Sequence, residues 1–314
     1  MAYDVLINGY VSMDHILKIE TPARVGFTSI ISNADNIKTN YGGCGPNIAV
    51  SLCKLGKAAM PIMRVGPDWE DNGFKDYLIK NNVSLEGTKV LENETTSTCY
   101  LIQDTNGNHI TCFYPGSMDG KYAERADEKL FDGTRLGVIT VGSRKDNKCF
   151  YEQCREHDVP IVFGMRVDFD AFPEPFMKEL LENSNIIFAN EAERDVICEI
   201  NGGKSIPELL KNWKACVVVI TLGEKGSLCY EHKGDEIIEH YIPICPVEKV
   251  VDATGAGDAY MAGFIYGWLN GEKVEKCCRL GAALSSFILQ CVGCTTNVPT
   301  PEVLEAKAEE IRTK

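Results

Sequence analysis

Short, nearly continuous apolar segments alternate along the chain with longer segments of helical periodicity. The apolar segments are residues 5–9, 137–141, 160–163, 185–189 and 216–221. Strands that are apolar on both faces are typical of a parallel sheet covered on both sides. Helical periodicity is found around residues 45–55, 71–81, 149–157, 174–183 and 206–213. The alternation predicts repeated strand–helix–strand units, and therefore an α/β fold with a mostly parallel central sheet.

Two stretches depart from this alternation. Residues 16–41 contain short extended segments with polar interruptions. Residues 96–115 have the pattern of a hairpin whose turn contains Asn106 and Gly107, a dipeptide that favours tight turns. Both stretches predict a small β-layer inserted into a single domain that spans residues 1–314. This layer is either a decoration of the fold or a lid that excludes water from a pocket.

The overall charge narrows the range of partners. The chain has 314 residues, of which 44% are hydrophobic, and its net charge is −13, from 32 basic and 45 acidic residues. Such an acidic chain argues against a nucleic-acid or anionic-membrane partner, although one local site can still bind ATP. The sequence shows neither a signal peptide nor an apolar run near the ~20 residues of a membrane helix. We therefore expect a cytoplasmic protein.

The fourteen cysteines are scattered, without the spacing of a disulfide framework. Cys291 and Cys294 form a C-x-x-C pair that no second pair accompanies. Because a structural zinc site needs about four ligands, we favour buried structural thiols over a metal or redox role.

The segment with the clearest chemistry is residues 252–258, which read DATGAGD and lead directly into an apolar helical run. The first turn of a helix has free backbone N–H groups that can hold an anion. Gly255 and Gly257 allow a phosphate to approach the backbone closely. Asp258 would repel that phosphate, so it more reasonably faces a hydroxyl that attacks one. The segment therefore indicates phosphoryl transfer to an alcohol.

A second glycine cluster, at Gly42 and Gly43, runs into a helix that carries Asn47 in its first turn. Asp14 follows the first strand, where the binding sites of parallel sheets gather. An amide and a carboxylate can bind the hydroxyl groups of a polyol, so these residues are candidates for the acceptor site. Taken alone, the glycines are better explained by a tight turn before an ordinary helix; Asp14 makes the functional interpretation more specific.

Two further segments follow expected strands. Asn190 and Glu193 follow the strand at 185–189, and their oxygens can organise Mg²⁺ and its waters. Thr221, Gly223 and Gly226 follow the next strand and can contact phosphate. Loops after strands favour such residues in any case, so each segment alone is weak.

Other nucleotide-binding patterns are absent from the sequence. It contains no G-x-x-x-x-G-K-[ST] segment, which argues against a P-loop NTPase. The glycines at 255 and 257 are followed by Tyr260 where a dinucleotide fingerprint needs its third glycine, so a dehydrogenase is disfavoured.

Taken together and in this order, the motifs resemble those of the ribokinase-like (PfkB) family of sugar and nucleoside kinases, along nearly the whole chain. Residues 42–49 are similar to the family's first signature and residues 252–258 to its second, the more specific one. The resemblance implies a three-layer α/β/α body with a mostly parallel sheet and a small β-sheet lid. ATP would lie along the carboxyl ends of the strands, and the acceptor under the lid.

The resemblance also implies roles for individual residues. Asp258 would be the catalytic base, and the amides of Gly255, Ala256 and Gly257 an anion hole for the transferred group. The acceptor would bind beside Asp14, Gly42, Gly43 and Asn47. The nucleotide would bind near Asn190, Thr221, Gly223 and Gly226, with Mg²⁺ held through water by Glu193. Asp252 and the Thr254 carbonyl would hold a monovalent cation such as K⁺. Because a helix N-terminus stabilises negative charge, we expect a low pKa for Asp258.

The acceptor is the open part of this interpretation. The family often has Asp at position 164 and Asn at position 12, where this chain has Gly164 and Ser12. Residues 43–49 and 113–118 resemble the adenosine-type nucleoside kinase branch, and Phe113 and Tyr114 can either stack on a purine or simply pack the hairpin onto the body. Several basic side chains would instead suit a sugar phosphate: Lys18, Arg24, Lys38, Arg64 and Arg166. A nucleoside is slightly favoured over a ribose- or fructose-type sugar or a sugar phosphate.

Two alternatives remain at this stage. A non-catalytic sensor could retain the fold, but this chain keeps Asp258 and the glycines before it. The edges of the lid strands could pair two subunits, and a monomer is equally compatible with the sequence.

Overall fold

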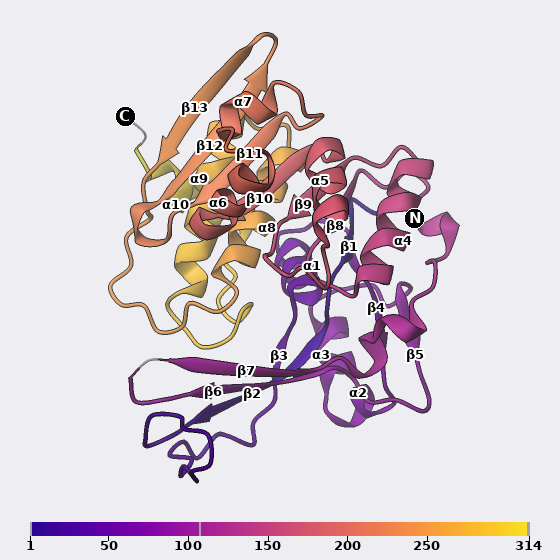
Figure 1. The fold of residues 1–314 in the computed structure, drawn as a ribbon, viewed down its shortest axis with the longest axis vertical. Coiled ribbons are helices and arrows are strands. Elements are labelled where there is room, and N and C mark those ends of the chain that lie inside the picture. The colour runs from indigo at the N-terminus through magenta and orange to yellow at the C-terminus, as the bar shows by residue number, and fades with distance from the viewer. Residues whose placement is uncertain (1, 107, 313–314) are drawn as a thin grey trace.

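The computed structural model describes residues 2–106 and 108–312, and within them the centre of the molecule is a nine-stranded sheet (Figure 1). Its strands run parallel from β11 to β5, and β12 and β13 are added antiparallel at one edge. In spatial order they are β13 (Glu236–Ile242), β12 (Ser227–Lys233), β11 (Val217–Thr221), β10 (Ile186–Asn190), β9 (Ile161–Gly164), β8 (Leu136–Ile139), β1 (Val5–Asn8), β4 (Ala59–Val65) and β5 (Thr88–Val90).

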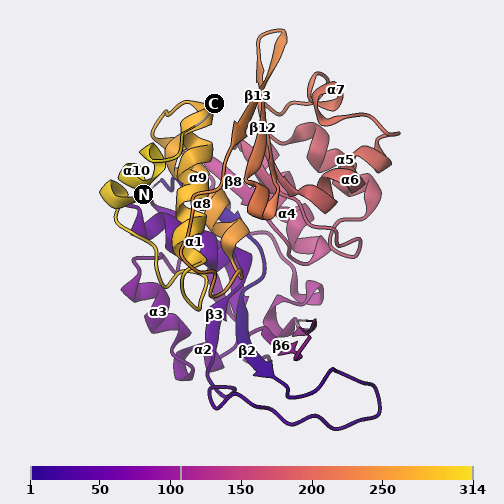
Figure 2. The ribbon, with the colours of Figure 1, turned by 90° about the vertical axis from the view of Figure 1, so that its left-hand side faces the viewer.

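Helices cover both faces of this sheet, which gives the expected three layers (Figure 2). One face carries α1 (Cys44–Lys54), α2 (Asp68–Asp71), α3 (Phe74–Lys80), α8 (Ala256–Leu269), α9 (Val274–Ile288) and α10 (Pro301–Glu309). The other carries α4 (Arg144–Glu156), α5 (Glu174–Asn183), α6 (Glu191–Ile200) and α7 (Ile206–Leu210).

The apolar strands are buried on both sides, as their composition predicts. In β1, Val5 and Ile7 pack into the core under α1, α8 and α9, whereas Leu6 packs into the core under α4 and α5. All three side chains are fully buried. The three-layer α/β/α prediction is therefore confirmed, and its cause is the alternation of side chains along each strand.

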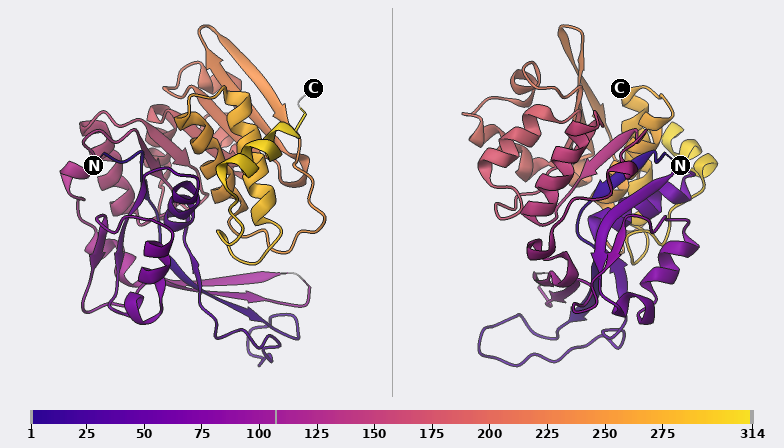
Figure 3. Two further views of the ribbon diagram at one scale, coloured as in Figure 1. Left: turned by 180° about the vertical axis from the view of Figure 1, so that it is seen from behind. Right: turned by 90° about the vertical axis from the view of Figure 1, so that its right-hand side faces the viewer.

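A second, small sheet with the order β3-β2-β6-β7 lies to one side of the body (Figure 1). Its strands are β2 (Ser12–Lys18), β3 (Asn40–Gly42), β6 (Thr98–Gln103) and β7 (His109–Tyr114). β6 and β7 form the expected antiparallel hairpin, whose turn residue Gly107 lies outside the described residues. β2 and β6 pair in parallel. Residues 19–39 form a long loop beside this sheet (Figure 3), and residues 28–31 contribute only a bridge between Ile19 and Ile31.

β4 was not expected from the sequence; it contains Pro61 and pairs with β1 over its first half. A proline is unusual in a central strand because it has no N–H to donate. Here β5 pairs only with Met63–Val65, so β4 has no strand on that side at Pro61. None of the helices within the described residues is both long and apolar enough to cross a membrane.

Candidate active site

A cavity of about 150 Å³ lies where β8, β9, β10 and β11 end, at the carboxyl edge of the sheet. It brings together candidates from three separate sequence segments, since its lining includes Asn190, Glu193, Thr221, Gly257 and Asp258. Ligand sites of open parallel sheets form at this edge, because the connecting loops and helix N-termini meet there. Gly255, Ala256, Gly223 and Gly226 do not line the cavity.

Asp258 lies in the first turn of α8, which begins directly after Gly255 in a left-handed conformation (φ 77°). Asn47 Nδ2 donates a 2.8 Å hydrogen bond to Asp258 Oδ2, and the Cys44 thiol donates to the same carboxylate. Burial raises the pKa of Asp258, and these two hydrogen bonds and the charge of Arg166 only oppose that rise. The expected low pKa was therefore wrong: the loss of hydration outweighs the helix N-terminus.

Asn47 reaches Asp258 because of the glycines before α1. Gly43 has φ 93°, and a Cβ at that position would lie 2.1 Å from the backbone oxygen of Tyr10. The turn therefore requires glycine and brings the start of α1 close to the end of β1. The Asn47 side chain is buried, and its amide bonds the Asp258 carboxylate directly.

Asp14 lies on β2, at the junction of the small sheet and the body. Its Oδ1 accepts a hydrogen bond from the Ser12 hydroxyl, at the position where the family pattern often has Asn. A Cβ on Gly42 would lie 2.2 Å from Asp14 Oδ2, so Gly42 provides the space that this carboxylate occupies. Burial raises the pKa of Asp14, opposed by the Ser12 hydrogen bond and the nearby His15. Asp14 and Gly42 do not line the cavity that contains Asp258.

Cys294 lies close enough for both carboxylates to act on it and was not anticipated as a neighbour of the site. The charges of Asp258 and Asp14 both act on its thiol, and burial raises the pKa of that thiol further. A Cβ on Gly255 would lie 2.6 Å from Cys294 Cβ, so Gly255 is needed for contact with this segment as well as for its own φ. All fourteen cysteines are free thiols. The only sequence signal at Cys294 is the C-x-x-C spacing, and that spacing does not predict its place beside Asp258 and Asp14.

The nucleotide candidates Asn190 and Thr221 lie side by side at the ends of β10 and β11. Asn190 Oδ1 accepts a 2.8 Å hydrogen bond from the Glu193 N–H, and Glu193 Oε2 accepts a 2.7 Å bond from the Asn190 N–H. This capping box starts α6 and fixes both side chains at the cavity. Burial raises the pKa of Glu193, opposed by the Asn190 N–H and by Arg166.

These residues fit Mg²⁺ only through water. Within residues 2–106 and 108–312, no three His, Cys, Asp or Glu side chains lie close enough together to hold a metal ion. One oxygen of the Glu193 carboxylate is already used in the capping box. Mg²⁺ keeps several waters and takes its remaining ligands from phosphates in kinase sites, which suits a single nearby carboxylate.

The loop before α8 is organised by Asp252. Its Oδ1 accepts a 2.9 Å hydrogen bond from the Thr254 N–H, and its Oδ2 lies 3.5 Å from the Gly293 nitrogen. Asp252 therefore links the loop of the second signature to the segment that contains Cys294.

Arg166 is a further site residue, and the sequence drew attention to it only as a possible ligand of a sugar phosphate. It follows β9 and lines the cavity together with Asp258 and Glu193. Arg64, expected in the same role, is instead buried and forms two hydrogen bonds with Asp146, of 2.7 and 2.8 Å.

A carboxylate in the first turn of a helix, at a cavity lined by polar groups from the ends of parallel strands, suits a phosphotransferase that acts on an alcohol. The sequence profile described as pfkB family carbohydrate kinase matches residues 3–301. The chain belongs to this family, and its class is therefore kinase, as the motifs indicated.

Two archaeal relatives match nearly the full length. The chain is 29% identical over 304 residues to a nucleoside kinase of Methanocaldococcus jannaschii, covering 97% of this chain and 96% of the relative. It is 28% identical to a nucleoside kinase of Methanothermobacter thermautotrophicus, covering 94% and 92%. The crystal structure of the Methanocaldococcus jannaschii nucleoside kinase, described as an archaeal member of the ribokinase family, superposes with a TM-score of 0.83 at 26% identity, covering 99% of this chain and 100% of that one.

Proposed function

We propose that the protein is an ATP-dependent kinase that phosphorylates the hydroxymethyl group of a nucleoside. The observation that carries the chemistry is the position of Asp258, held by Asn47 at a cavity that Asn190 and Thr221 enter from the neighbouring strands. The nucleoside acceptor is supported by the two full-length relatives named nucleoside kinases. A ribose- or fructose-type sugar, or a sugar phosphate, is the second candidate.

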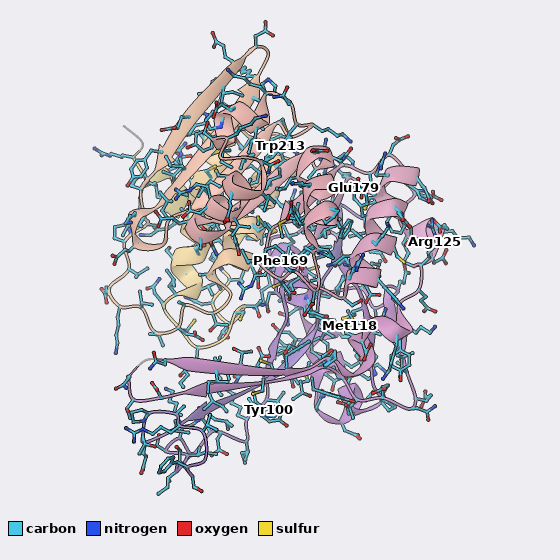
Figure 4. The ribbon with its side chains drawn as sticks, viewed as in Figure 1. Tyr100, Met118, Arg125, Phe169, Glu179 and Trp213 are labelled. Atoms are coloured by element: carbon cyan, nitrogen blue, oxygen red, sulfur yellow. The ribbon has the colours of Figure 1, made fainter. Side chains whose placement is uncertain are left out.

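An aromatic pair favours the nucleoside over the sugar. The rings of Phe113 on β7 and Tyr10 after β1 lie 4.8 Å apart between centroids, at 56° to each other. Phe113 remains 39% exposed, so part of its ring is free to contact a base. Figure 4 shows Phe169 on the loop after β9, in the body, and Tyr100 on β6, in the small sheet. Tyr100 stacks on His15 on the sheet face opposite to Phe113, so Phe113 is the aromatic side chain that the small sheet turns toward the body. The small sheet would act as a lid over the site.

In the proposed reaction, the acceptor hydroxyl lies against Asp258 and attacks the γ-phosphorus of ATP. A bond forms between the hydroxyl oxygen and phosphorus, the bond from phosphorus to the leaving ADP oxygen breaks, and the proton passes to Asp258. A raised pKa makes Asp258 a better base than a surface aspartate. The amides at the start of α8, at Gly255, Ala256 and Gly257, stabilise the transferred group, although the Ala256 N–H also reaches the Ala253 carbonyl at 3.3 Å. Losing one such donor typically costs on the order of 10²–10³ in rate.

The remaining residues have positioning roles in this proposal. Asp14, with the space provided by Gly42 and Gly43, binds sugar hydroxyls. Asn190 and Thr221 contact the nucleotide phosphates, Gly223 and Gly226 shape the turn beside them, and Glu193 holds Mg²⁺ through water. Asp252 and the Thr254 carbonyl hold a monovalent cation, which a comparison of activity in KCl, NaCl and a tetramethylammonium salt tests directly.

The acceptor is identified by measuring ADP release from ATP and Mg²⁺ with adenosine, inosine, cytidine, ribose, fructose and fructose 6-phosphate in turn. We expect a nucleoside to give the highest kcat/KM, and D258N to abolish the stimulation. Stimulation by a sugar alone would replace the nucleoside by the second candidate. If no acceptor stimulates ADP release, the protein is better described as a sensor on the same fold.

Two further proposals concern the state of the protein. The outer strand β7 exposes Ile110, Phe113 and Tyr114, which supports pairing of two small sheets into a dimer. Light scattering of the purified protein tests it, and a monomeric mass would contradict it. The free thiols support a reducing, cytoplasmic location, which imaging of the tagged protein tests.

A further inference from the structure

Arg166 is a cation at the cavity whose guanidinium group has no hydrogen-bond or ion-pair partner in the described part of the chain. It follows β9, the strand that lies between β8 and β10, and it lines the cavity with Cys44, Glu193 and Asp258. Among residues 2–106 and 108–312, no carboxylate forms an ion pair with it, and no hydrogen bond engages its guanidinium group. Its side chain is exposed, whereas the buried Arg64 is fully paired with Asp146.

The groups that Arg166 faces come from three elements that meet at the cavity. Its positive charge acts on Asp258 in α8, on Glu193 in α6 and on Cys44 at the start of α1. Because Arg166 lines one cavity with Asp258 and Cys44 as well as with Glu193, it lies where the acceptor side and the nucleotide side meet. In a kinase reaction the transferred phosphoryl group occupies the space between these two sides, and it carries negative charge spread over its oxygens.

The end of the strand before Arg166 adds no side chain of its own to the cavity. Gly164 ends β9, and a Cβ at that position would lie 2.5 Å from Met261 Cε on α8. The acidic side chain that the family often has at position 164 thus has no room here unless Met261 moves. The strand end consequently offers the cavity a guanidinium group and no carboxylate of its own.

We propose that Arg166 binds the γ-phosphoryl group of ATP and holds it through transfer, acting from β9 together with the amides at the start of α8. A guanidinium group can donate two parallel hydrogen bonds to phosphoryl oxygens and neutralise charge as the bond to ADP breaks. Arg166 takes no proton and forms no bond, so the balance of the transfer reaction is unchanged. The inference rests on the kinase activity of the family and not on which acceptor is used.

The first test needs no acceptor. Binding of ADP and of a non-hydrolysable ATP analogue is measured by calorimetry, with Mg²⁺, for the wild type, R166Q and R166K. Arg155, in the last turn of α4 at the opposite edge of the sheet, provides the matched control R155Q. We expect R166Q to lose at least tenfold in affinity for the analogue and to change little toward ADP, with R155Q unchanged. Equal affinities of R166Q and the wild type for the analogue would overturn the proposal.

The second test uses turnover with the acceptor found in the panel. R166Q should lower kcat by about 10²–10³, the usual cost of removing a donor to the developing charge, with the KM of the acceptor nearly unchanged. Added guanidinium should partly restore turnover of R166A, which a purely structural role would not allow. A normal kcat in R166Q would overturn the role of Arg166 and leave the kinase function intact. An inactive wild type would instead count against the proposed acceptor, and calorimetry would still decide on Arg166.

Discussion

Asn47 and Asp258 lie 211 positions apart in the sequence and are joined by one hydrogen bond, 2.8 Å from Nδ2 to Oδ2. This bond connects the two glycine-rich signatures, since Asn47 follows Gly43 and Asp258 follows Gly257. The first signature therefore holds the proposed base as well as shaping the acceptor site. The Cys44 thiol, from the start of the same helix as Asn47, donates to this carboxylate as well.

Replacing Asn47 by leucine removes a hydrogen bond that favours the charged form of Asp258. The pKa of Asp258, already raised by burial, should rise further. Because the base must be ionised, activity is lost as pH falls through this pKa, so the acid limb of the kcat/KM profile should move to higher pH in N47L. We also expect a loss of roughly 10²-fold at the optimum through misplacement of the carboxylate. An unchanged acid limb in a folded N47L protein would contradict the role of this bond.

The variant D258N should fold, because asparagine has the same shape and can still accept a hydrogen bond from Asn47. Its turnover should fall almost to zero, since the amide cannot take the proton of the acceptor hydroxyl. Steady-state ADP release measures the loss, and the melting temperature and ATP affinity serve as controls. Near-normal turnover would remove Asp258 from the role of base.

Much of the fold could be predicted from the sequence because burial on both faces leaves a continuous apolar pattern, as in β1 and β11. The pattern failed where other constraints decide. Helical periodicity placed the start of α4 at residue 149, but the helix begins at Arg144, because Ser143 caps it by accepting a hydrogen bond from the Asp146 N–H. β12 and β13, at the edge of the sheet, mix polar and apolar residues without a continuous apolar run, and they were not anticipated.

The candidate site was predictable where glycines and acids recur in one segment, and unpredictable where partners come from distant segments. Residues 252–258 point to their chemistry by themselves. The contact of Cys294 with Gly255, and the approach of Arg166 to Asp258, depend on how α8 packs against the ends of β9 and the C-terminal segment. The expectation of a low pKa for Asp258 was wrong for the same reason. The position of a residue in a helix can be read from the local sequence, whereas its burial depends on how the whole molecule packs.

Gly42 and Gly43 should respond differently to alanine. In G42A the new methyl group would meet the end of the Asp14 side chain, which can move, so we expect a folded protein with a raised KM for the acceptor. In G43A the methyl group would meet the backbone of Tyr10 at a φ of 93°, so stability should fall by more than about 1 kcal/mol. Melting curves and acceptor kinetics distinguish the two, and equal effects would contradict this separation.

Shortening Phe113 tests whether the aromatic pair with Tyr10 reads a base. F113A should raise the KM for a nucleoside about tenfold, in line with the ~0.5–1.5 kcal/mol of an aromatic contact plus its buried area. The kcat should change little, because the ring is remote from the reacting atoms in the proposed site. Ribose, tested with the same variant, serves as the control. A parallel loss for ribose would mean that Phe113 only packs the small sheet onto the body.

The buried pair of Arg64 and Asp146 gives a prediction about stability. Both side chains are nearly inaccessible, at 7% and 6% exposure, and their two hydrogen bonds tie β4 to the start of α4. R64M leaves the Asp146 carboxylate buried without its cation, so the free energy of unfolding should fall by about 3–5 kcal/mol. R64M/D146L has no unpaired buried carboxylate, and the backbone N–H of residue 146 can still donate to the Ser143 hydroxyl that caps α4. This double variant should have a larger free energy of unfolding than R64M in urea. A double variant that is no more stable than R64M would show that lost packing, and not the unpaired carboxylate, sets the cost.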